Sequence, residues 1–203
     1  MNNSSKEFIK FVRHQCKRYK FSLILSKDSH FTEDGNSYGG YFSAYDKTIA
    51  VSNSEDEQWL ISTLVHEYSH FEQWIYEDPV FFKLLRGGLD AGVVLSKWIN
   101  GVTYKNSTIK RAIQLIRDCE LDCERRALVN IDKFNLSINK LEYCQESNAY
   151  LYFHNYVKKK RKWEFKNSPI DVPEILTQMP TDLNQNYGVL PRYYELLFDE
   201  YLN

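Results

Sequence analysis

The sequence lacks the features that would hold a chain in a membrane or draw it to a polyanion. Its 203 residues carry a formal net charge of -1, so no whole-protein field attracts nucleic acid or anionic lipid. No segment approaches the roughly 20 apolar residues that a membrane span needs. The first residues carry charges throughout and include no apolar stretch of signal-peptide length. We therefore expect a cytoplasmic protein with no membrane partner and no nucleic-acid partner.

Paired cysteines are absent as well. The four cysteines are Cys16, Cys119, Cys123 and Cys144, and none lies in a CxxC pair. This spacing argues against a structural zinc knuckle. Without an export signal, we expect reduced thiols. Cys119 and Cys123 lie four residues apart on one predicted helix, and we expect both to pack as small apolar residues.

What the sequence does contain is ample material for one globular core. Hydrophobic residues make up 43% of the chain, and 15 tyrosines and 12 phenylalanines supply large apolar side chains. No internal repeat or low-complexity linker interrupts it. We predict a single domain over residues 1–203, with a sheet and a motif-bearing helix in residues 1–78 and a mostly helical half in residues 79–203.

The spacing of apolar residues predicts an α+β fold. About three strands should form a small sheet packed on the motif-bearing helix, and a turn-rich stretch should separate the first strand from the next. Helices are expected over residues 6–19, from about 54 to about 76, over one or two short stretches within 80–100, and over 107–133, 139–163 and 191–201. Strands are expected over 21–25, 41–45 and 47–52.

The segment LVHEYSH contains an HExxH motif on a predicted helix. Because an α-helix turns once in about 3.6 residues, His66 and His70 point the same way and can reach one ion. Glu67 can then face a metal-bound water as general base, with Zn²⁺ as the cofactor. A chance match would instead leave these side chains on a solvated face. The apolar flanks, such as Leu64 and Phe71, favour a buried helix, in which two histidines need partners.

The third ligand must come from another part of the chain. The HExxHxxGxxH arrangement is absent, because Gln73 replaces the glycine and Tyr76 the final histidine. Glu120 falls inside the apolar stripe of the long predicted helix, where a carboxylate needs a cationic partner such as zinc. Glu124, one turn later, could accept a hydrogen bond from a ligating histidine and fix its tautomer. The alternative is a salt-bridge cluster with neighbouring arginines, among them Arg117.

Two stretches resemble a known peptidase core. The segment GGYFSAYDKTIAVSN followed by LVHEYSH is similar to the minimal gluzincin core, in particular that of ImmA/IrrE-type peptidases. In those families the third ligand lies in E-x-x-A-[ND]-x-x-A, which matches Glu120 and Ala127. Cys123 replaces the first alanine and Glu124 the Asn or Asp. The resemblance implies a zincin-like fold with Glu120 as ligand, and it leaves the role of Glu124 open.

The C-terminal half also resembles uncharacterised phage-encoded metallopeptidase-like proteins. The shared segments are ELDCERRAL, NAYLYFHNYVKKKRKW and MPTDL. This resemblance implies no substrate. It does imply the host cytoplasm as the location if the chain is viral, and it admits association with a virion.

Three further features have competing interpretations. His154 is a candidate to stabilise the oxyanion opposite the metal, whereas the alternative is an aromatic helix face packed on the core. The basic run 158–162 could contact nucleic acid, or it could be a solvated helix end. In zincins of this layout the strand at 47–52 is an edge strand that pairs with an extended substrate, and the alternative is a strand paired on both sides.

The leading hypothesis is a zinc-dependent endopeptidase acting on a protein or peptide substrate, with Glu67 as general base and then acid. A second hypothesis is a catalytically silent zincin-fold protein with a binding, structural or regulatory role. A third is a DNA-associated protease resembling SprT-like proteins, which typically use a third histidine rather than a glutamate.

Overall fold

The computed structural model describes residues 1–28, 30–33, 36–52, 56–85 and 90–203. It divides into two compact units. The first comprises Met1–Asp78 and Cys123–Ile138, and the second comprises Pro79–Asp122 and Asn139–Asn203. The predicted boundary at residue 78 coincides with a boundary between the units, whereas the end of the long helix α5 (Asn106–Lys133) belongs with the N-terminal half.

The first unit contains the predicted three-stranded sheet. Its strands are β1 (Ser22–Ser26), β4 (Gly40–Ser43) and β5 (Thr48–Ser52), in the order β1-β5-β4. Strand β5 pairs with β1 in parallel and with β4 in antiparallel orientation, and all five of its residues are buried. The prediction that residues 47–52 form an edge strand was therefore wrong, because β1 occupies the other side of β5.

A second ladder lies in the segment predicted to be rich in turns. Strands β2 (Phe31–Glu33) and β3 (Asn36–Tyr38) pair in antiparallel orientation. Each is only three residues long, so the segment holds too few residues for an alternation of apolar and polar side chains to stand out.

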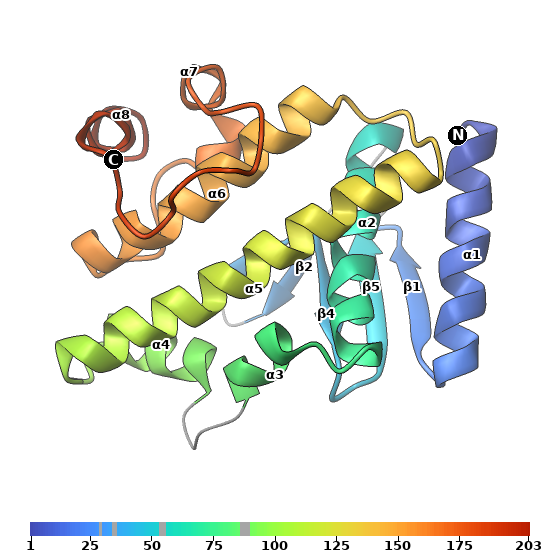
Figure 1. Cartoon of the computed structure of the whole chain (residues 1–203), viewed down its shortest axis with the longest axis horizontal. Coiled ribbons are helices and arrows are strands. Elements are labelled where there is room, and N and C mark those ends of the chain that lie inside the picture. Colours follow the sequence, from blue (N-terminus) through green and yellow to red (C-terminus); the bar gives the residue numbers. More distant parts are fainter. Residues whose placement is uncertain (29, 34–35, 53–55, 86–89) are drawn as a thin grey trace. The chain divides into compact units, whose positions relative to one another are not determined.

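Two capped helices flank the sheet of the first unit (Figure 1). Helix α1 (Asn3–Tyr19) begins after Asn2, whose side chain accepts a hydrogen bond from the Ser5 backbone. Helix α2 (Glu57–Ile75) begins after Asp56, which accepts one from the Gln58 backbone. Such caps satisfy backbone N–H groups that the first turn leaves unpaired. Helix α2 packs against β5 and β4, which confirms the predicted sheet-on-helix arrangement.

The end of α5 completes the first unit through aromatic and polar contacts. Phe134 packs against the rings of Phe8 and Phe11 on α1. Asn130 donates a hydrogen bond to Glu72 of α2 at 2.8 Å. The ring contacts hold Phe134, which directly follows α5, against α1, and the hydrogen bond holds α5 against α2, the helix that carries the motif.

The second unit is helical, which confirms the mostly helical C-terminal half of an α+β fold. Besides residues 106–122 of α5, it contains α3 (Pro79–Leu85), α4 (Ala91–Ile99), α6 (Lys140–Lys160), the 3₁₀ turn η1 (Pro169–Asp171), α7 (Pro173–Leu176) and α8 (Arg192–Tyr201). Within the described residues, no helix is both long enough and apolar enough to cross a bilayer.

One buried amide anchors the irregular segment between α7 and α8. The Asn148 side chain, on α6, donates to the carbonyl oxygens of Pro180 and Asp182 at 3.0 and 2.9 Å. Its own oxygen accepts a hydrogen bond from the Tyr187 hydroxyl at 2.6 Å. Because Asn148 is fully buried, the loss of these bonds would leave polar atoms unsatisfied.

Candidate metal centre

Helix α2 presents the motif residues from its middle turns. Its buried face packs on β5 and β4, and Glu67 is only 7% exposed. His66 and His70 are half-buried one turn apart. Their ring centroids lie 4.8 Å apart with the planes at 87°. The spacing of four residues on a helix brings the two imidazoles together, as the sequence predicted.

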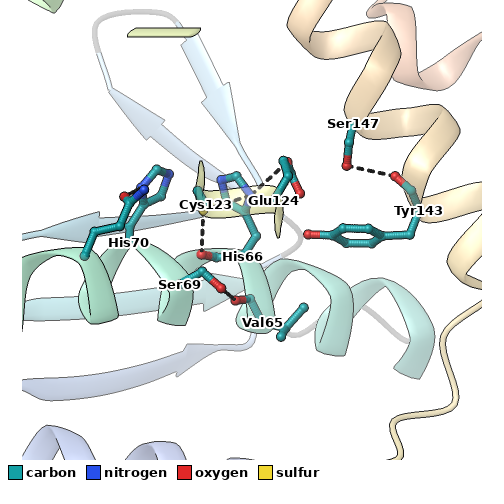
Figure 2. Close-up of polar contacts among 9 residues, drawn as sticks. Val65, His66, Ser69, His70, Cys123, Glu124, Tyr143 and Ser147 are labelled. Carbon is teal, nitrogen blue, oxygen red and sulfur yellow. Dashed lines mark hydrogen bonds and ion pairs between the residues drawn. The ribbon is translucent and has the colours of Figure 1, made fainter. Parts of the chain in front are cut away.

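The His66 ring is oriented by a carboxylate from α5. Its Nδ1 lies 3.1 Å from Oε1 of Glu124 (Figure 2). An ionised carboxylate can only accept, so the imidazole proton lies on Nδ1 and the lone pair of the neutral ring lies on Nε2. Glu124 makes the hydrogen bond to a motif histidine that the sequence predicted. Its role beside a bound metal stays a prediction.

The His70 ring is oriented in the same way by an amide of its own helix. Its Nδ1 donates to Oε1 of Gln73 at 2.9 Å. Gln73 lies three residues further along α2 and is fully buried. The lone pair of neutral His70 therefore also lies on Nε2. Two imidazoles held through Nδ1 by oxygen acceptors are typical of histidines that ligate a metal.

Cys123 adds a sulfur to the pair of histidines. Its Sγ lies 3.7 Å from His66 Nδ1 and donates to the His66 carbonyl oxygen at 3.3 Å (Figure 2). Donor atoms of His66, His70 and Cys123 all lie within 4.8 Å of one another, so this group could hold a metal ion. Cys123 was expected only to pack as a small apolar residue. The signal that could have revealed its place beside the histidines is the thiol at a position where the resembled peptidase motif has an alanine.

The electrostatics of the site favour a cation. Burial opposes a charge on the His66 ring, but Cys123 and Glu124 outweigh it and hold the pKa of His66 well above its usual value. The same surroundings would stabilise a metal cation at the histidines.

The sheet approaches the motif helix closely at Glu67. A Cβ on Gly40, at the start of β4, would lie 3.2 Å from Cγ of Glu67 and 2.8 Å from Cγ2 of Thr63. It would also lie 2.9 Å from the carbonyl oxygen of Ala50 on β5. Glycine at this position therefore allows the strand to pass directly beside the proposed general base.

Glu120, the predicted third ligand, belongs to the second unit. Its side chain is half-buried, and its Oε2 atom is shielded from solvent. Arg117, one of its alternative partners, donates to Asn155 at 3.0 Å and lies 3.9 Å from Asp118. Glu120 as a metal ligand stays a prediction.

His154, the predicted oxyanion stabiliser, is fully buried in the second unit. Its Nδ1 donates to the Tyr150 carbonyl oxygen at 2.9 Å, and its ring packs against Tyr150 and Trp163. Burial lowers the pKa of His154, so the ring is neutral. These contacts are those of the alternative in which this helix face packs on the core, and a catalytic role for His154 stays a prediction.

The basic run at the end of α6 has partners within the second unit. Lys159 pairs with Glu195 and Lys160 with Asp199. Arg161 donates to the carbonyl oxygens of Trp98 and Val102. Lys162 lies 4.8 Å from the centroid of a phenylalanine ring. Four of the five basic side chains of the run thus have an intramolecular contact, and contact with a nucleic acid stays a hypothesis.

Comparisons with known proteins found no relative of this chain. No family model, no curated protein and no solved structure matches it.

Proposed function

We propose that the chain is a zinc-dependent peptidase of the gluzincin kind, in which His66 and His70 hold the ion and Glu67 is the general base. The observation that supports it most is the orientation of the two imidazoles. Each ring donates from Nδ1 to a side-chain oxygen, so in each neutral ring the lone pair that a metal needs lies on Nε2.

Zinc suits the donors that the site offers. Neutral imidazole nitrogens are good zinc ligands, and hydrolytic sites combine three protein ligands with a water. We propose Glu120 as the third ligand, on the basis of its match to the family motif. The alternative is the Cys123 thiol, which lies with the histidines in the first unit.

Glu67 would perform the proton transfers. A bound zinc would act as a Lewis acid that polarises the peptide carbonyl and lowers the pKa of water. Glu67 would take the proton of the water whose oxygen bonds to the carbonyl carbon, and would pass it to the amine that leaves as the C–N bond breaks. Its 7% exposure keeps bulk water away from the carboxylate.

The substrate would be a peptide in extended conformation. Among the described strands, β4 lies at the end of the sheet order, and its first residue abuts Glu67. A peptide that paired with this edge would run past the general base. This proposal moves the substrate strand from β5, where the sequence placed it, to β4.

The replacement of Glu67 by Gln tests the function. The variant should retain about one zinc per chain, because no ligand changes, and should lose hydrolysis of an unfolded protein substrate by at least about 100-fold. The exposed Glu142→Gln is the matched control and should behave as wild type.

Two results would overturn the proposal. Wild-type protein purified with ample zinc and carrying no metal would remove the site altogether. Wild-type protein that binds zinc but cleaves no member of a peptide library would instead support the catalytically silent alternative.

A further inference from the structure

We propose that Gln73 is a positioning residue that sets both the affinity and the reactivity of the metal site by orienting His70 with a neutral amide. The inference rests on the proposed function, because it requires His70 to be a metal ligand. It adds a role for a residue that lies outside the HExxH motif.

The geometry ties Gln73 to one imidazole nitrogen. Residues three apart on a helix lie on the same face, so Gln73 reaches His70 without any contribution from another element. Its Oε1 accepts from Nδ1 at 2.9 Å, and the side chain is fully buried. A buried amide in a helix interior needs hydrogen-bond partners, and the bond to Nδ1 supplies one.

The two histidines consequently donate to hydrogen-bond acceptors of different charge. His66 donates to the carboxylate of Glu124, whereas His70 donates to the uncharged amide of Gln73. A hydrogen bond to a carboxylate is charge-assisted and makes an imidazole a more basic ligand. His66 should therefore be the stronger ligand of the pair and His70 the weaker.

An uncharged acceptor at His70 has opposite effects on zinc affinity and on the Lewis acidity of the ion. More basic ligands bind an ion more tightly, but they donate more electron density and make the ion a weaker Lewis acid. Gln73→Glu should therefore raise zinc affinity and lower kcat. Gln73→Met, which removes the acceptor and releases the ring, should lower zinc affinity by about 10- to 100-fold.

The opposite signs separate this role from a structural one. If Gln73 only packed the helix, both substitutions would lower metal affinity and kcat together. Gln73→Glu is nearly isosteric, so it changes the charge of the acceptor with little change in volume.

The experiment measures zinc dissociation constants by competition with a chelator, and kcat on a peptide substrate, for the full chain. Gln58→Glu is the matched control, because it adds the same charge at an exposed position of α2. The thermal midpoint of each metal-free variant verifies that it is folded. We expect tighter zinc and a lower kcat for Gln73→Glu, weaker zinc for Gln73→Met, and no change for Gln58→Glu.

The outcomes separate this inference from the proposed function. If folded Gln73→Met binds zinc as tightly as wild type, or if Gln73→Glu loses both affinity and kcat, the role of Gln73 is refuted while the peptidase proposal stands. If wild-type protein binds no zinc, both fail.

Discussion

At the scale of single residues, two side chains are candidates for the third metal ligand. Glu120 would supply a carboxylate oxygen and Cys123 a thiolate sulfur. The Cys123 thiol already donates to the His66 carbonyl oxygen, and His66 Nδ1 is engaged by Glu124. Both contacts suit a metal on the Nε2 side of the His66 ring, away from the Cys123 thiol, and Glu120 stays the proposed third ligand.

Replacement of zinc by cobalt tests which of the two side chains is the third ligand. We expect Glu120→Gln to lower metal affinity by at least about 10- to 100-fold, the usual loss for a residue that only hydrogen-bonds a ligand, because a catalytic site loses one of its three protein ligands. Cys123→Ser should change affinity little, and the cobalt protein should show no sulfur-to-metal charge-transfer band. Cys119→Ser, a buried cysteine one turn earlier in α5, is the control. A charge-transfer band that disappears in Cys123→Ser alone would contradict the assignment.

At the scale of secondary-structure elements, the contact between β4 and α2 positions Glu67. A methyl group at Gly40 meets the Ala50 backbone oxygen at 2.9 Å and the Thr63 methyl at 2.8 Å. The backbone atom belongs to the central strand of the sheet, so it has little freedom to move.

Gly40→Ala should therefore lower the free energy of unfolding by about 1 to 3 kcal/mol, the usual range for overpacking a core. It should also reduce activity, because relief of the clash displaces the strand beside Glu67. Urea denaturation measures the first effect. Gly92→Ala, within α4, meets only the end of the Asp90 side chain and should be neutral or stabilising. Equal stability of the two variants would refute the close contact.

The position of each helix and strand along the chain was predicted from sequence more accurately than which elements lie next to one another in space. The helix expected over residues 107–133 is α5 (Asn106–Lys133), and the strands expected near residues 41–45 and 47–52 are β4 and β5. Their side-chain periodicity is local and can be counted along the chain. The central place of β5 could not be counted in this way, because it depends on pairing with β1, which lies more than 20 residues earlier.

At the scale of the whole molecule, metal binding should stabilise the fold by mass action. Zinc at 100 times its dissociation constant should add about 2.7 kcal/mol to the free energy of unfolding, provided that the unfolded chain does not bind it. Thermal melts of the full chain with zinc and with a chelator measure this stabilisation as a shift of the thermal midpoint. His66→Ala and His70→Ala should each abolish most of it, whereas the exposed His14→Ala should retain it.

The size of this stabilisation should also depend on pH. Despite the opposing effect of burial, Cys123 and Glu124 raise the pKa of His66, so protons compete with the metal for its ring. The zinc-dependent shift of the thermal midpoint should therefore become smaller as pH falls through the raised pKa of His66, and larger as pH rises. A shift of the same size at acid and alkaline pH would contradict His66 as a ligand.

The sequence by itself determined the convergence of His66 and His70, because their spacing on one helix is a local property of the backbone. It also indicated Glu124 as the partner of a motif histidine, from its place beside the apolar stripe of α5. Only the tertiary structure decided which histidine Glu124 meets, that Cys123 lies beside His66, and that β4 borders Glu67. The reason is that these contacts join residues 27 to 58 positions apart in sequence, and their geometry depends on how helices and strands pack rather than on the pattern within any one of them.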